Sequence, residues 1–186
     1  MVQSGGQRFR QQANDWSVWR SRAPRRQDSI LVDPNVTFRS RNHVQATAGL
    51  ATSGVVPAEE FERIAEAGYR TVINLLPDES QYALQREESV VASHGMAYVH
   101  IPVSFDAPTI ENFDEFRAAM DAHATSPVWV HCAANMRVSV FVALYGQLEL
   151  GWSTDRAKNL IEEIWEPTAP WISLSDKILA RERGED

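Results

Sequence analysis

The sequence predicts an α/β fold in which helices flank a mainly parallel central sheet. Three observations support this class: short β-branched apolar runs recur along the chain, segments with a helical period separate them, and proline, glycine or serine marks most junctions. Alternation of this kind is typical of parallel strands joined by crossover helices that cover both faces of the sheet. The 186 residues suffice for one domain with a substantial core.

The chain divides by composition near residue 35. Residues 1–42 carry eight arginines and three aspartates, whereas the remainder carries ten basic and 22 acidic residues, so the net charge of −7 is unevenly distributed. Residues 1–35 are polar and lack a sustained period, which predicts a flexible basic tail ahead of a single domain at residues 36–186. A solvated tail is the simplest interpretation, and binding of nucleic acid or an acidic partner is the alternative.

The first half of the predicted domain supplies strands and helices in alternation. Residues 43–53 contain one or two short strands, and the helix expected at 57–68 begins with proline and ends with glycine. The run TVINLL (71–76) predicts a buried strand, and YVHIPV (98–103) predicts another. Residues 80–94, which lie between these two strands, have a helical pattern that a glycine closes.

The second half continues the alternation and then becomes helical. Thr109 can cap a helix, and PVWVHC (127–132) predicts a short apolar strand. The segment VSVFVALYGQLELG (138–151) is apolar almost all round, which indicates a helix packed on most sides. Ser153 can cap a further amphipathic helix, and a last helix is expected over residues 170–183.

The stretch VWVHCAANMRVS (128–139) contains the only cysteine of the chain, at the predicted carboxyl end of a strand. Ligands of parallel sheets bind outside the carboxyl ends of the strands, and free N–H groups at the following helix N-terminus favour an anion. The same field favours thiolate, and thiols in such settings titrate as low as roughly 3.5–7.5. Alone, Cys132 is better interpreted as a small core hydrophobe, but His131 before it, Arg137 after it and the strand-loop-helix context favour a functional loop.

The segment HCAANMR resembles the signature of the cysteine-dependent protein tyrosine and dual-specificity phosphatases, His-Cys-x-x-Gly-x-x-Arg followed by Ser or Thr. The wider chain from Leu50 to Pro170 resembles their compact bacterial branch, the dual-specificity-phosphatase-like or beta-lactamase-hydrolase-like phosphatase domains. GLATSG, AGYRTVINL, YVHIPVSFDAPT and VWVHCAANMR follow the order of elements in that branch. The resemblance implies a protein tyrosine phosphatase-like fold and metal-independent hydrolysis of phosphomonoesters through a phosphocysteine.

The resemblance also implies roles for individual residues. Cys132 would attack phosphorus, and Asp106, in the loop after YVHIPV, would protonate the leaving oxygen. Beside these roles, we expect His131 to pack beneath the loop, hydrogen-bond the backbone and tune the thiolate. Ser139 either offers a hydroxyl to the thiolate in the breakdown step or is an ordinary first-turn serine. The phosphate would lie among the N–H groups and the side chain of the loop residues Ala133, Ala134, Asn135, Met136 and Arg137.

The loop departs from the signature in length. Four residues rather than five separate Cys132 from Arg137, Asn135 falls on the glycine position, and Ser139 keeps the spacing that the family has from its cysteine. One residue at a helix start rotates a side chain by about 100°. The loop is therefore either rebuilt to aim Arg137 inward or impaired as a phosphate site, and we expect a compact site with Arg137 pointing into it.

Two other functions remain open from the sequence. A Cys-x4-Arg loop is also typical of rhodanese-like sulfurtransferases, although AANM lacks their usual glycine or cationic and hydroxyl groups, and sulfur transfer needs no acid loop. A pseudophosphatase that binds phosphorylated ligands without turnover is the third possibility.

Composition limits the partners and the location of the protein. A single cysteine cannot form an intrachain disulfide, which fits a reducing, cytoplasmic location, and no apolar run reaches the roughly 18 residues of a membrane helix. Neither a Gly-rich dinucleotide fingerprint nor a Walker loop is present, and no metal-ligand spacing is found, so we expect neither cofactor nor metal. We expect a phosphorylated protein or small molecule as substrate and a monomer or weak oligomer.

Overall fold

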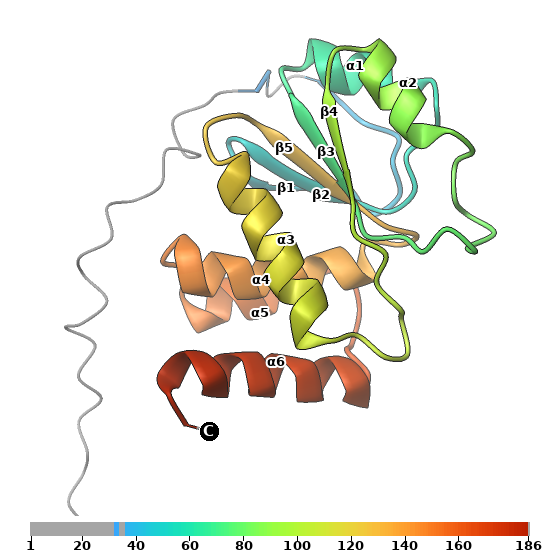
Figure 1. The fold of residues 1–186 in the computed structure, drawn as a ribbon. Helices are drawn as coiled ribbons and strands as arrows, with labels where there is room; N and C mark the ends of the chain where they lie inside the picture. The colour runs from blue at the N-terminus through green and yellow to red at the C-terminus, as the bar shows by residue number, and fades with distance from the viewer. Residues whose placement is uncertain (1–31, 34–35, 186) are drawn as a thin grey trace, which may run out of the picture.

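Five short strands form one sheet in the order β1-β2-β5-β3-β4 in the computed structural model, which describes residues 32–33 and 36–185 (Figure 1). The strands are β1 (Val44–Thr47), β2 (Leu50–Ser53), β3 (Thr71–Asn74), β4 (Ala97–His100) and β5 (Val128–His131). Only β1 and β2 pair antiparallel, as a hairpin, and the other three pairs are parallel. The prediction of a mainly parallel sheet is thus confirmed.

Helices cover both faces of the sheet, as expected (Figure 1). On one face lie α1 (Glu60–Glu66) and α2 (Glu87–Ser93), and on the other lie α3 (Ile110–Ala122), α4 (Met136–Glu149), α5 (Thr154–Glu162) and α6 (Ala169–Arg183). The expected N-caps are present, because the side chains of Thr109 and Ser153 accept hydrogen bonds from the N–H groups of Asn112 and Arg156.

The central strand β5 divides the apolar core into two halves. Val128 and Val130 face the larger half beneath α3, α4 and α6, and Trp129 faces the smaller half beneath α1. Successive side chains of a strand point to opposite faces, so a strand covered on both sides must be apolar at every position. Helix α4 is buried over most of its surface, in keeping with its apolar sequence.

Several predicted boundaries are wrong by a few residues. The helix expected over 80–94 begins only at Glu87, and residues 79–86 form turns. Arg86 precedes this helix with a left-handed φ of 58°, a conformation that cannot continue a helix backwards. Strands β3 and β4 end at Asn74 and His100, two and three residues before the apolar runs do.

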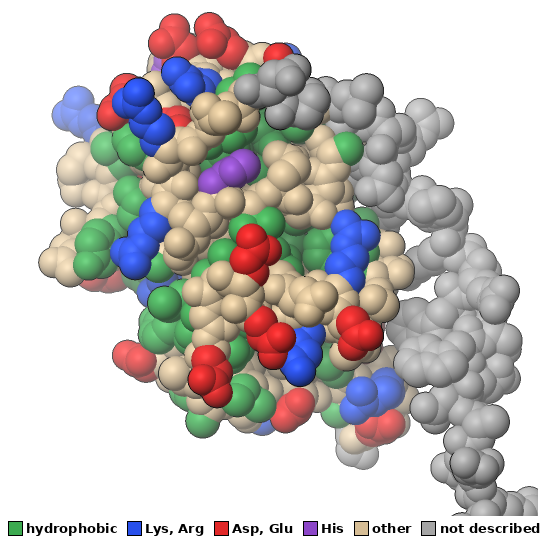
Figure 2. Space-filling view, turned by 180° about the vertical axis from the view of Figure 1, so that it is seen from behind, with side chains coloured by type: hydrophobic (Ala, Val, Ile, Leu, Met, Phe, Trp, Pro, Cys, Tyr) green, Lys and Arg blue, Asp and Glu red, His purple; other side chains and the backbone are tan. Residues whose placement is uncertain are grey.

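Most of the predicted tail lies outside the described residues. Its Val32 is 8% exposed and packs in the smaller core half, and the N–H group of Asp33 donates to the carbonyl of Ala67 at 3.1 Å. On the face shown in Figure 2, acidic and basic side chains interleave with apolar ones. Among the described residues, no helix is long and apolar enough to span a bilayer.

Candidate active site

Cys132 follows the central strand at the carboxyl edge of the sheet. Its neighbour His131 pairs with Ser53 of β2 on one side and with Asn74 of β3 on the other. The Cys132 N–H donates to the Ser53 carbonyl at 3.2 Å, and the Leu75 N–H donates to the His131 carbonyl at 2.9 Å. The strand ladders therefore fix the start of the loop from both sides. The thiol itself is 0% exposed.

Two asparagines hold the middle of the loop. Asn135, on the glycine position of the signature, has a left-handed φ of 66°, and Asn42 has a φ of 49°. Asn135 Nδ2 donates to the Asn42 carbonyl at 2.7 Å and to Thr52 Oγ1 at 2.9 Å, while Asn42 Nδ2 donates to the Ala134 carbonyl at 2.9 Å. Asparagine tolerates left-handed backbone better than other non-glycine residues, so it replaces glycine here and also adds a side-chain anchor.

The first turn of α4 opens toward the loop. The N–H group of Ser139 makes the first backbone bond of this turn, to the Asn135 carbonyl at 2.9 Å. The N–H groups of Met136, Arg137 and Val138 precede that bond, and such leading groups have no partner within a helix. They are positioned to receive an anion.

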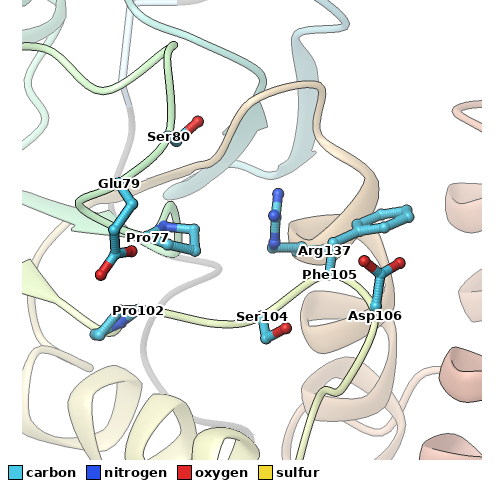
Figure 3. A pocket seen from close by; sticks show the side chains of 8 residues that line it. All are labelled: Pro77, Glu79, Ser80, Pro102, Ser104, Phe105, Asp106 and Arg137. Carbon is cyan, nitrogen blue, oxygen red and sulfur yellow. The ribbon is translucent and has the colours of Figure 1, made fainter.

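Arg137 rises from this first turn into an open pocket of about 550 Å³ (Figure 3). Its Nε donates to the Val103 carbonyl at 2.9 Å, and its guanidinium carbon lies 5.2 Å from the centre of the Phe105 ring. Within the described residues the two terminal nitrogens have no hydrogen-bond partner, so they can still receive two oxygens of one oxyanion.

Asp106 lies in the segment between β4 and α3 and is exposed. It lines the same pocket as Arg137, and in the view of Figure 3 both gather with Phe105 at one side, opposite Glu79 and Pro102. The complete lining is Pro77, Glu79, Ser80, Pro102, Ser104, Phe105, Asp106 and Arg137. The structure thus brings two of the three predicted catalytic residues to one pocket, and buried Cys132 is not part of its lining.

A buried polar network lies beneath the loop. His131 Nε2 is 2.6 Å from Glu87 Oε1, and Glu87 Oε2 accepts a hydrogen bond from Asn74 Nδ2 at 3.2 Å. Asn74 Nδ2 also donates to the Tyr98 hydroxyl at 3.0 Å. Burial, reinforced by the charge of Glu87, raises the pKa of Tyr98 to about 12, so this phenol stays protonated. Sequence reasoning missed Glu87, Asn74 and Tyr98, and only the polar Asn74 within the apolar run TVINLL signals the network.

The Ser139 hydroxyl is engaged inside its own helix. It donates to the Met136 carbonyl at 2.9 Å and accepts a hydrogen bond from Trp165 Nε1 at 3.2 Å. No hydrogen bond joins it to Cys132 in the part of the chain that the structure describes. Here Ser139 therefore links α4 to the segment between α5 and α6.

A parallel sheet with a cysteine loop at its centre, followed by an arginine-bearing helix, defines a phosphatase-like domain. The family model for the phosphatase-like domain of the beta-lactamase hydrolase-like protein matches residues 43–148, more than half of the chain. The chain belongs to this family, as its sequence motifs predicted.

Relatives and solved structures agree with this assignment. The beta-lactamase hydrolase-like protein of Xylella fastidiosa is 34% identical over 98 residues, which are 51% of this chain and 22% of that protein. The chain thus spans about a fifth of the length of these curated relatives. A candidate phosphatase (DUF442) from Shewanella putrefaciens CN-32 is 33% identical, with a TM-score of 0.70 over 77% of this chain and 94% of that chain.

More distant structures share the fold. Tk-PTP in its active form is 18% identical, with a TM-score of 0.65 over 78% of this chain and 99% of that chain. TpbA of P. aeruginosa, in complex with pTyr, is 14% identical, with a TM-score of 0.59 over 72% of this chain and 82% of that chain. The fold expected from the sequence, that of the protein tyrosine phosphatases, is therefore confirmed.

Proposed function

We propose that the protein hydrolyses phosphomonoesters without a metal, through a phosphocysteine on Cys132. The observation that carries this proposal is the convergence of Arg137 and Asp106 on one pocket, with Arg137 in the helix turn that follows the loop of Cys132. The loop N–H groups and the terminal nitrogens of Arg137 would bind the phosphoryl oxygens and stabilise the charge that develops on them.

In the first step the Cys132 sulfur, as thiolate, attacks phosphorus and forms an S–P bond. The bond from phosphorus to the ester oxygen breaks, and Asp106 transfers its proton to that oxygen, so an alcohol or phenol leaves. In the second step a water attacks phosphorus and gives a proton to Asp106. The S–P bond breaks, the thiolate returns, and inorganic phosphate is released.

The complete burial of Cys132 supports a second candidate function. A thiol that is 0% exposed cannot reach phosphorus unless the surrounding loop moves, whereas Arg137 already lines the pocket. A domain that binds phosphorylated ligands without turnover would need only the arginine and the N–H groups. Sulfur transfer has weaker support, because Asp106 has no role in it and the family is phosphatase-like.

The substrate class follows from the same chemistry. An open pocket with an arginine above an aromatic ring fits a phosphate on an aryl or alkyl carrier, and the related TpbA has been crystallised with pTyr. We therefore propose phosphorylated proteins or small molecules as substrates.

A pair of assays on one purified sample tests the proposal. We expect phosphate release from an aryl phosphate in the presence of EDTA, and no thiocyanate from thiosulfate plus cyanide. Cys132→Ser should abolish phosphate release and still bind vanadate or phosphate. Retention of more than a few per cent of the rate by this variant would remove Cys132 as nucleophile. An inactive wild-type protein that still binds phosphate would favour the binding domain.

A further inference from the structure

The segment that carries Asp106 is anchored from three directions. On the sheet side, the Val103 N–H donates to the Leu75 carbonyl at 3.2 Å. On the loop side, Arg137 Nε donates to the Val103 carbonyl at 2.9 Å. From the far helical layer, Trp171 Nε1 donates to the Phe105 carbonyl at 2.8 Å. The last of these bonds holds the residue immediately before Asp106.

Trp171 is a rigidly held hydrogen-bond donor. It lies in the first turn of α6 and is 0% exposed, and its ring packs 5.8 Å from that of Phe141 in α4 and 6.3 Å from that of Trp165. A large ring enclosed in this way has little rotational freedom. Its N–H group therefore offers the Phe105 carbonyl one fixed position.

The Phe105 side chain is held by the same cluster. Its ring centre lies 5.5 Å from that of Trp165 and 6.0 Å from that of Trp171, and the Arg137 guanidinium lies over it. Beyond Asp106, the next anchor is the capping box of α3, in which Thr109 and Asn112 exchange hydrogen bonds. Asp106 thus lies on a short span between two fixed points.

From this arrangement we infer that Trp171 is a positioning residue that sets the place of Asp106 for proton transfer. The inference rests on the proposed function, and it extends the active site to α6, beyond the residues 43–148 that the family model matches. Trp171 contacts neither the substrate nor the loop of Cys132. It acts through the Phe105 carbonyl, and its effect should therefore be confined to reactions that need the acid.

The test compares Trp171→Phe with Trp152→Phe. The first change removes the N–H group and keeps an aromatic ring. The second makes the same change at a buried tryptophan between α4 and α5, which packs against Gly146 and Arg156 away from the acid segment. Both variants lose core volume, so the melting temperatures of the two variants measure the loss of stability that this change alone causes.

We expect Trp171→Phe to lower kcat by about tenfold on alkyl phosphates and by less than twofold on 4-nitrophenyl phosphate, because only poor leaving groups need the proton. A tenfold loss is smaller than the roughly 10²–10⁴-fold that a general acid contributes, as befits a displaced rather than a deleted acid. Trp152→Phe should show no such selectivity.

In the Asp106→Asn background, Trp171→Phe should add no further loss, because both changes act on one step. Equal losses on both substrates, or full additivity with Asp106→Asn, would overturn the inference.

A second measurement does not depend on turnover. Amide hydrogen exchange in peptides covering residues 101–109 should become faster in Trp171→Phe and stay unchanged in Trp152→Phe. Unchanged exchange in both variants would overturn the anchoring role, even in a protein with no phosphatase activity. Failure of the proposed function is recognised separately, by a wild-type protein that releases no phosphate.

Discussion

Asn135 shows how one side chain compensates for a shortened loop. A glycine there would supply the left-handed backbone alone, whereas Asn135 also donates to the Asn42 carbonyl and to Thr52 Oγ1. These two bonds join the loop to Asn42, which precedes the β1–β2 hairpin, and to Thr52, which lies within it. The loop geometry therefore depends on residues that are 93 and 83 positions earlier in the sequence. These hydrogen bonds offset the steric cost of left-handed backbone at a non-glycine residue, which is about 1–2 kcal/mol.

At the same scale, Glu87 is expected to maintain the buried network under Cys132. Glu87→Ala leaves His131 Nε2 facing a cavity, and an unsatisfied buried group costs about 1–3 kcal/mol, whereas Asn74 Nδ2 loses one partner and keeps its bond to the Tyr98 hydroxyl. We therefore expect the free energy of unfolding, measured in urea titrations, to fall by about 1–3 kcal/mol. Phosphate affinity should fall with it, because His131 immediately precedes Cys132, the proposed nucleophile.

The neighbouring Glu88 provides a matched control. It lies on the exposed side of the same helix, so Glu88→Ala removes the same charge without touching the network. A Glu87→Ala protein as stable as Glu88→Ala would show that the buried contact with His131 contributes nothing to the fold.

Among the elements, the hairpin β1–β2 does more than extend the sheet, because Gly54, the residue after β2, lies against the Cys132 loop. A Cβ added at Gly54 would lie 2.8 Å from the Ala133 carbonyl oxygen and 3.0 Å from the Ala134 Cα. The Val55 N–H donates to that same Ala133 carbonyl at 3.2 Å. Backbone atoms, not a flexible side chain, fill the space, so the loop itself must move to admit a methyl group.

We therefore expect Gly54→Ala to disturb the site more than the fold. Overpacking of this kind costs typically 1–3 kcal/mol, which a domain of this size can tolerate. Displacing Ala133 and Ala134 should lower phosphate or vanadate affinity by about tenfold or more, since the loop N–H groups must converge within a few tenths of an ångström. Calorimetric titration with vanadate checks this, and unchanged affinity together with unchanged stability would contradict it.

The elements were more predictable than the contacts between them. Apolar periods and caps predicted every strand region and the helices capped by Thr109 and Ser153, because those signals act over a few residues. The helix before β4 was predicted too long, since nothing local revealed the left-handed Arg86. Motif spacing likewise selected the Cys132 loop. The partners of that loop could not be predicted, because Glu87 lies 44 positions from His131 and Trp171 lies 66 from Phe105.

At the scale of the whole molecule, the sheet separates two core halves that consist of different elements and side chains. The larger half joins α3, α4 and α6, whose outer edges are tied by Arg117 to Glu149 and Glu182. The smaller half holds Phe38, His43, Tyr69 and Trp129 in one aromatic cluster on the other side of β5. A half-buried histidine in this second half, His43, makes the stability of the whole domain depend on pH.

His43 lies flat against Trp129, with ring centres 5.0 Å apart and planes inclined by 18°, and its Nε2 is buried without a partner among the described residues. Burial lowers the pKa of His43 below 6.5, and the charge of Glu60 opposes this only in part. The unfolded chain, with a histidine pKa of about 6.5, therefore binds more protons than the folded protein at mildly acidic pH. The contribution of neutral His43 to the free energy of unfolding is fully present above pH 6.5. It is lost progressively as the pH falls from 6.5 to the lowered pKa of the folded state.

His43→Phe should remove this dependence while keeping a ring against Trp129. We expect the urea midpoint of the wild-type protein to fall between about pH 7 and pH 5 more steeply than that of the variant, because only the wild-type histidine must take up a proton on unfolding. All other titratable side chains are the same in both proteins, so the difference between the two curves reports His43 together with its interaction with Glu60. If the urea midpoints of the wild-type protein and of the variant fall in parallel over this range, the aromatic cluster accommodates the charged ring. His43 would then contribute nothing to the pH dependence of stability.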